Sequence, residues 1–173
     1  MLAEIILSNK ALVTRYLAGF DDASALAQPP GLPNHAIWNL GHLALTMHRV
    51  AAMLDGQALP ASDFVTTGTK RGSRARGHFD TDSVAFGSSP AASADDFPTL
   101  ARAIEIFSAA VDRLAAAASN ASDADLDKPF PWGHPSSPFK WYVLAARMLF
   151  HNGFHTGQIA DTRRALAFKS VFA

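Results

Sequence analysis

His151 and His155 lie four residues apart in the stretch Leu149-Phe150-His151-Asn152-Gly153-Phe154-His155-Thr156-Gly157-Gln158-Ile159, near the C-terminus. On an α-helix, residues four apart share one face and lie one turn from each other. The same face carries Leu144 and Met148 before the pair, so it otherwise belongs to a core. Burying two imidazoles costs free energy unless each has a partner. The pattern therefore indicates either a shared metal ion or two histidines with separate partners.

Helical periodicity extends from this stretch over most of the chain. Four amphipathic helices are predicted, over residues 2–20, 34–54, 93–120 and 139–166. Asn34 is a good N-cap for the second, and Asp95 and Asp96 favour the start of the third. Four such helices without a strand pattern predict an all-α, four-helix-bundle fold in a single domain over residues 1–173. A long connector before the third helix predicts an up-down-down-up order.

Two connectors have no clear period. Residues 57–97 are rich in glycine and proline, and a short helical piece is expected only around Ser62-Asp63-Phe64. Residues 123–138 form the second connector. The first one also carries Lys70, Arg71, Arg74 and Arg76. This basic cluster is interpreted as a solvated loop or, alternatively, as a contact for an anionic ligand.

The composition excludes several classes of function. Fifteen basic residues balance fifteen acidic ones among 173, so no nucleic-acid or membrane partner is expected. The chain has no cysteine, which excludes disulfides, Cys-based zinc sites and a protein thiol nucleophile. Charged residues interrupt the apolar N-terminal stretch, and no apolar run is long enough to span a bilayer. A cytoplasmic protein is the expectation.

A third histidine on another helix would favour the metal interpretation. His42 lies in the middle of the second predicted helix, on a face shared with Leu45 that is expected to point inward. His48 falls about 120° further round and is predicted at the surface. His35 either gates a site or caps the helix. Exposed loop positions are expected for the histidines of the Gly- and Pro-containing stretches, His78 and His134.

Three neutral imidazoles from two helices suit a borderline divalent metal such as zinc, nickel or iron. The predicted ligands are His42, His151 and His155. Three protein ligands leave positions for water or a substrate, as in catalytic sites, whereas closed structural sites usually have four.

Three segments carry a resemblance to a known family: Asn34-His35-Ala36-Ile37-Trp38-Asn39-Leu40-Gly41-His42-Leu43-Ala44, Phe86-Gly87-Ser88-Ser89-Pro90 and Phe150-His151-Asn152-Gly153-Phe154-His155-Thr156-Gly157-Gln158-Ile159. Together they resemble the DinB-like (YfiT-like) metalloprotein superfamily. The resemblance covers nearly the whole chain. It implies a four-helix bundle, often a homodimer, with a divalent metal on His42, His151 and His155.

The resemblance also implies a chemistry. Some members of this family use a low-molecular-weight thiol, such as bacillithiol or mycothiol, in transfer or isomerisation of a small-molecule substrate. A metal lowers the pKa of a bound thiol, and without cysteine in this chain the thiol must be a cosubstrate. The alternatives are a metal-dependent hydrolase that activates water, a non-catalytic metal-binding dimeric interaction bundle, and packing histidines without a metal.

The catalytic residues are not predicted by the sequence. Asn152 follows His151 where zinc proteases have a glutamate, and Asp161 points about 80° away from His151, so a general base is missing. Residues expected to surround the metal or line a substrate pocket are Gln158, Trp38, Thr46, His35, Arg71 and Arg74.

Overall fold

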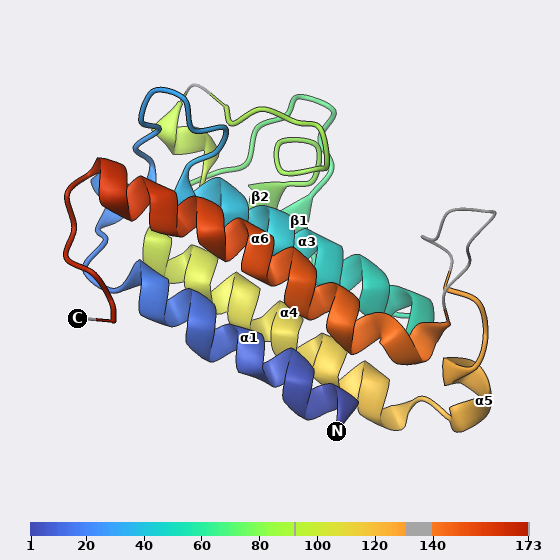
Figure 1. The fold of residues 1–173 in the computed structure, drawn as a ribbon. Coiled ribbons are helices and arrows are strands. Elements are labelled where there is room, and N and C mark those ends of the chain that lie inside the picture. Colours follow the sequence, from blue (N-terminus) through green and yellow to red (C-terminus); the bar gives the residue numbers. More distant parts are fainter. Residues whose placement is uncertain (92, 131–139, 173) are drawn as a thin grey trace.

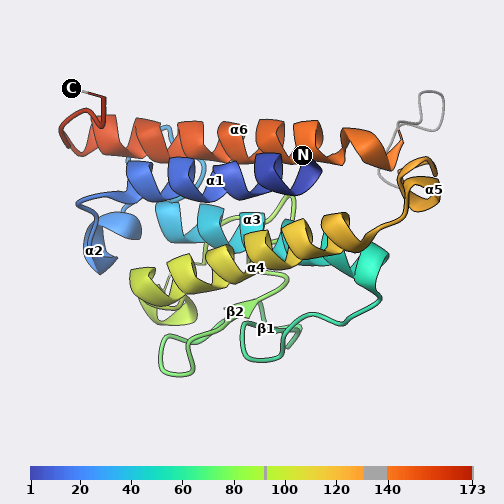
Figure 2. The same cartoon turned by 90° about the horizontal axis from the view of Figure 1, so that it is seen from below.

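The computed structural model describes residues 1–91, 93–130 and 140–172. Within these ranges the chain is mostly helical, as the sequence predicts (Figures 1 and 2). The long helices are α1 (Leu2–Leu17), α3 (Ala36–Asp55), α4 (Leu100–Asn120) and α6 (Leu144–Ala165). In the described residues, no helix combines the length and the apolar character that crossing a bilayer requires.

The four long helices lie alongside one another. In both views α1 and α6 run in one direction, and α3 and α4 run in the other (Figures 1 and 2). Helix α3 packs against α4 and α6, and α1 packs against the same two helices. Apolar side chains from all four are fully buried between them, among them Ile6, Leu40, Phe107 and Leu144. Helices α3 and α6 are thus antiparallel neighbours, which places the middle of one beside the middle of the other.

Helix α3 is buried over most of its length, because α4 and α6 cover it together with the connector over residues 57–97. That connector contains two short strands, β1 (Phe64–Val65) and β2 (Phe79–Asp80), which pair in parallel with Phe64 opposite Phe79. The helix expected around Ser62-Asp63-Phe64 is wrong. One turn forms there, with the backbone N–H groups of Asp63 and Phe64 donating to Pro60, and Phe64 then enters the strand.

Gly41 lets this connector lie directly against α3. A Cβ at Gly41 would lie 2.7 Å from the ring of Phe79 and 2.9 Å from Val84, both of which are fully buried. Any side chain at position 41 would push these residues away from the helix. The connector is therefore fixed to α3 one residue before His42.

The remaining connectors contain short elements: α2 (Asp22–Ala25), η1 (Ala94–Asp96), α5 (Asp123–Leu126) and η2 (Trp141–Val143). The third long helix begins at Leu100 rather than Ser93. Pro98 disfavours helical backbone at Phe97, which is extended, and the Thr99 side chain caps the helix by accepting from the N–H of Arg102.

The other boundaries also differ slightly from the prediction. The N-cap of α3 is His35 rather than Asn34, because the His35 ring accepts from the N–H of Trp38. Helix α1 ends at Leu17, shortly before Gly19, whose φ is +85°. Helix α6 begins at Leu144, after η2. The predicted start of this helix at Phe139, like His134, lies outside the described residues.

Candidate metal centre

Three imidazoles meet between α3 and α6. His42 comes from α3, and His151 and His155 come from successive turns of α6. The Nε2 atoms of His42 and His151 lie 3.2 Å apart, and one ring nitrogen from each of the three residues lies within 4.8 Å of the others. Nitrogen ligands on a tetrahedral zinc ion, at roughly 2.0–2.1 Å from the metal, are separated by about 3.3 Å. The His42–His151 pair thus already has the spacing of two ligands to one ion.

His42 is fixed by contacts with the connector over residues 57–97. Its Nδ1–H donates to the carbonyl oxygen of Val84 at 2.8 Å. Since a carbonyl oxygen can only accept, the proton lies on Nδ1 and the lone pair of Nε2 points toward His151. Trp38, one turn earlier, stacks on the His42 ring with 4.9 Å between ring centroids, and the indole N–H donates to the carbonyl of Ser83. Both contacts keep the ring in one orientation.

His155 is fixed in a similar way by amide side chains. Its Nδ1–H donates to Oδ1 of Asn39 at 2.7 Å, and Oε1 of Gln158 lies 3.3 Å from the same nitrogen. The amide nitrogen of Asn39 donates to the carbonyl of His35, so its oxygen is the atom left to accept. This arrangement presents Nε2 of His155 as the free ligand atom. Such partners of the second ring nitrogen are typical of metal-binding histidines.

Burial keeps the three imidazoles neutral. It lowers the pKa of His155 to about 3 and that of His151 to about 4, and it also lowers the pKa of His42. The positive charges of Arg147 and Arg49 lower the pKa of His151 and His42 further. Neutral imidazole is the form that binds a metal, so the donor set fits a borderline divalent cation.

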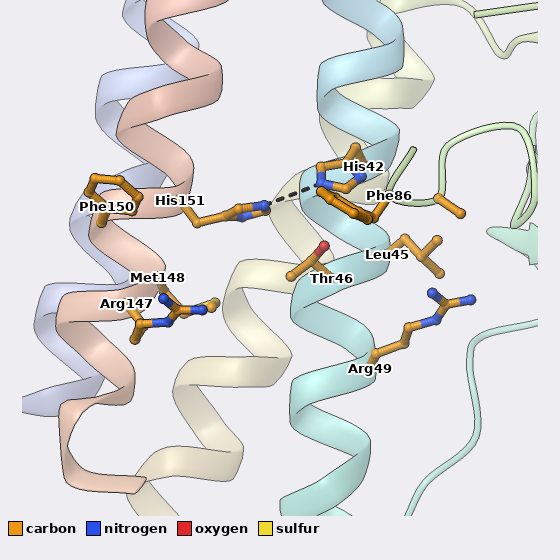
Figure 3. Close-up of a pocket in the computed structure, with 10 residues that line it drawn as sticks. His42, Leu45, Thr46, Arg49, Phe86, Arg147, Met148, Phe150 and His151 are labelled. Carbon is orange, nitrogen blue, oxygen red and sulfur yellow. Dashed lines mark hydrogen bonds between the residues drawn. The ribbon is translucent and has the colours of Figure 1, made fainter. Parts of the chain in front are cut away.

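Two cavities open beside the imidazoles. The first has a volume of about 380 Å³, and its walls combine imidazole, guanidinium, hydroxyl and apolar groups (Figure 3). The second, of about 390 Å³, is walled largely by uncharged polar and aromatic side chains, including Trp38, Ser88 and Gln158. His42, His151 and Phe86 line both. The imidazoles therefore stand between two spaces, each of the size that a small molecule occupies.

A model of the DinB superfamily matches residues 8–159, most of the chain. The chain belongs to the DinB superfamily. Among solved structures, a conserved protein from Enterococcus faecalis is similar, with 15% sequence identity and a TM-score of 0.68 over 96% of this chain and 95% of that chain. At this identity the likeness shows a shared fold. No curated protein matches the chain.

Three further residues named from the sequence lie close to the triad of this DinB-superfamily chain. Trp38 and Gln158 line the second cavity, and Thr46 lines the first. His35 instead caps α3, packed edge-on against Phe97 with 4.6 Å between ring centroids, so it has the capping role rather than the gating one.

The basic cluster of the connector lies elsewhere. Arg74 pairs with Asp22 at 2.9 Å, and Arg71 is exposed and lines neither cavity. The surface position predicted for His48 is wrong, since its side chain is 1% exposed. The helical period gives the direction of a side chain around α3, but this face of the helix is covered by Phe64 and α4.

Several residues near the triad were missed by sequence reasoning. Arg49 lies seven residues after His42 and Arg147 lies four before His151, so helical spacing could have placed both beside the imidazoles. Asn39 lies three residues before His42, so helical spacing could have placed it there too. The contact of the Val84 carbonyl with His42 could not be predicted from the sequence, because every residue carries the same backbone carbonyl group.

Proposed function

We propose that this DinB-superfamily protein is a metal-dependent enzyme that uses an exogenous low-molecular-weight thiol to modify a small electrophilic molecule, by transfer or isomerisation. The observation that supports this proposal is the convergence of His42, His151 and His155 at the edge of two cavities. The three rings are buried or half-buried, and two of them have their second nitrogen fixed by a hydrogen bond. Zinc, nickel and iron all suit such a donor set.

A divalent metal held by these residues would lower the pKa of a thiol or a water molecule bound to it, producing a nucleophile near neutral pH. In a transfer reaction, the sulfur forms a bond to an electrophilic carbon, the leaving group departs with its electron pair, and the thiol proton passes to solvent. In an isomerisation, the sulfur adds to the substrate and is later eliminated, so the thiol is regenerated. The chain has no cysteine, so the sulfur comes from a second molecule.

A metal-dependent hydrolase is the alternative enzyme. Water is far less acidic than a thiol, so hydrolysis usually employs a general base near the metal. Asp161, the carboxylate closest in sequence to the pair, instead forms an ion pair with Arg164 on an exposed turn of α6. This observation favours the thiol reaction. A non-catalytic metal-binding bundle would be expected to supply a fourth protein ligand, whereas the group found in the described residues has three.

The experiment is a comparison of thiol transfer and hydrolysis in protein loaded with zinc, nickel or iron(II). Thiol transfer to 1-chloro-2,4-dinitrobenzene is measured with several low-molecular-weight thiols, and hydrolysis is measured with 4-nitrophenyl acetate. His42→Ala removes one proposed ligand, and His78→Ala is the matched control, because His78 lies in the connector away from both cavities.

Metal-dependent thiol transfer above the uncatalysed rate, lost in His42→Ala and retained in His78→Ala, is the expected result. Hydrolysis alone would favour the alternative enzyme. Metal binding with neither activity would favour the non-catalytic bundle, and no metal binding at all would contradict the whole proposal.

The protein is also proposed to form a homodimer. Apolar side chains are exposed on the outer face of α6, with Phe150 72% and Phe154 58% exposed. Sedimentation equilibrium measures the association directly. A monomer at micromolar concentration would contradict the dimer and leave the metal centre unaffected.

A further inference from the structure

We propose that the first cavity binds a small organic anion, which is attracted by the positive charges of Arg49 and Arg147 and places its apolar part against Leu45, Phe86 and Met148. The inference rests on the proposed function in one respect: the anion would be the substrate or cosubstrate of that reaction. It names the chemical class of ligand, which neither the family nor the fold determines.

Two arginines, one from each of the metal-binding helices, line this cavity. Arg49 comes from α3 and Arg147 from α6, and both line the same space as His42 and His151 (Figure 3). Figure 3 shows them on either side of Thr46, at the end of the cavity away from the His42 ring. If the acidic group of the ligand lies at that end, the rest of the ligand points toward the imidazoles.

The charge of the cavity is positive. Its lining contains arginines and neutral residues, and no carboxylate among the residues that the structure describes. Arg102 pairs with Asp63 and Arg113 pairs with Asp55, both outside this cavity. Arg49 is exposed and makes no ion pair within residues 1–91, 93–130 and 140–172. A cleft of one sign between apolar walls concentrates ligands of the opposite sign.

The apolar wall indicates that the anion is an organic one. Phe86 is 95% exposed and lines the cavity together with Leu45 and Met148. An exposed aromatic ring beside a cavity gains free energy when an apolar group covers it. Inorganic phosphate would pair with the guanidinium groups but would leave the Phe86 ring in water. A carboxylate with an apolar body satisfies both.

The two cavities differ in the charge of their lining residues, and this difference assigns the anion to the first cavity. Amide, hydroxyl and indole groups line the second cavity, together with the imidazoles, and no arginine is among its lining residues in the described chain. An uncharged polar molecule suits that side. The triad would then separate an anionic ligand from a neutral one.

The test uses 3-phenylpropionate and its uncharged isostere 3-phenylpropionamide as probes. Their binding to the full chain is measured by isothermal titration calorimetry, in metal-free and in zinc-loaded protein, for the wild type and for Arg49→Gln, Arg147→Gln and Arg49→Lys. Arg71→Gln is the matched control, an exposed arginine that lines neither cavity. Circular dichroism establishes that each variant is folded.

The carboxylate is expected to bind about tenfold more tightly than the amide, the effect of one charge-assisted hydrogen bond. Arg49→Gln and Arg147→Gln should each remove most of that difference, Arg49→Lys should restore part of it, and Arg71→Gln should change nothing. The preference should also weaken with salt, because Arg49 and Arg147 are exposed to solvent and salt screens exposed charges.

Equal affinity for acid and amide would overturn the proposal. So would carboxylate binding that requires zinc and is unaffected by Arg49→Gln and Arg147→Gln, because the carboxylate would then be a simple metal ligand. Arginine-dependent binding in metal-free protein would support the anion site even if the thiol-transfer assay failed. The two proposals can therefore fail independently.

Discussion

His42 and His48 lie on the same helix, and their surroundings differ in a way that defines the site. Both are buried, with 6% and 1% of the side chain exposed, and burial lowers the pKa of both. His42 faces His151 and lines a cavity. His48 instead accepts from Arg113 and packs edge-on against Phe64. A buried imidazole with a low pKa is thus not in itself a sign of function; the convergence of several ligand atoms beside open space is.

Removal of one triad imidazole should have the largest effect. In His155→Ala, we expect metal affinity to fall more than about 100-fold, since loss of a ligand exceeds the 10–100-fold effect of losing a residue that orients one. In His48→Ala, the metal affinity should be unchanged, although the free energy of unfolding should fall. Metal content after dialysis, measured by inductively coupled plasma mass spectrometry, together with zinc titration, separates the two variants. Equal metal loss in both would contradict the assignment of His155 as a ligand and of His48 as a purely structural histidine.

Gly41→Ala should disturb the support of His42 by steric pressure. The added Cβ would lie within 3 Å of Phe79 and Val84 side chains, so we expect a loss of about 1–3 kcal/mol in unfolding free energy. Zinc binding should weaken as well, because Val84 also holds the His42 ring.

Gly153→Ala is the matched control for that substitution. Nothing lies within 4 Å of a Cβ at Gly153, which is exposed on α6, and alanine is the better helix former. This variant should gain up to about 1 kcal/mol in unfolding free energy. Urea denaturation measures both variants, and a Gly41→Ala protein as stable as the wild type would mean that the connector does not press on α3.

Asn39→Ala tests the orientation of His155 without removing a ligand. The variant loses the oxygen that accepts from the His155 Nδ1–H, so zinc affinity should fall roughly tenfold. Asn9→Ala is the control, because Asn9 is a buried asparagine of α1 whose side chain, among the described residues, bonds only to carbonyls of its own helix. Competition with a zinc-binding dye gives both affinities. If Asn39→Ala binds zinc as tightly as Asn9→Ala, the ring is held by Gln158 alone.

The last prediction concerns the acid stability of metal-free protein. Burial and the Arg113 charge lower the pKa of His48 to about 4, against opposing effects of Asp63 and Asp55. The unfolded chain binds that proton near pH 6.5. The contribution of neutral His48 to stability is therefore complete above about pH 6.5 and is lost as the pH falls toward 4.

In His48→Gln, the free energy of unfolding should depend less steeply on pH across that window, by about 1.4 kcal/mol per pH unit. Urea titrations between pH 4 and 7 measure this slope. An unchanged slope would show that His48 is charged in the folded protein or does not titrate in this range.

Much of the arrangement could be predicted because it depends on helical spacing. The interval between His151 and His155 determines a shared face, and the position of His42 in the second long helix determines its inward direction. The predicted ends of the helices were less accurate. The cap at His35, for example, depends on a side-chain conformation that helical periodicity does not indicate.

What could not be predicted depends on the connector over residues 57–97. Its strands and turns bring Phe64 over His48 and the Val84 carbonyl to His42, contacts between segments far apart in sequence that no local pattern records. For the same reason, Arg74 was expected near the site but is held by Asp22. The guanidinium groups beside the imidazoles come instead from the metal-binding helices themselves.

Anomalous diffraction at the zinc edge, from crystals of the zinc-loaded protein, tests the central claim most directly. One strong peak is expected between α3 and α6, about 2.0–2.1 Å from Nε2 of His42, His151 and His155. A peak at another position, or zinc held by fewer than these three imidazoles, would contradict it.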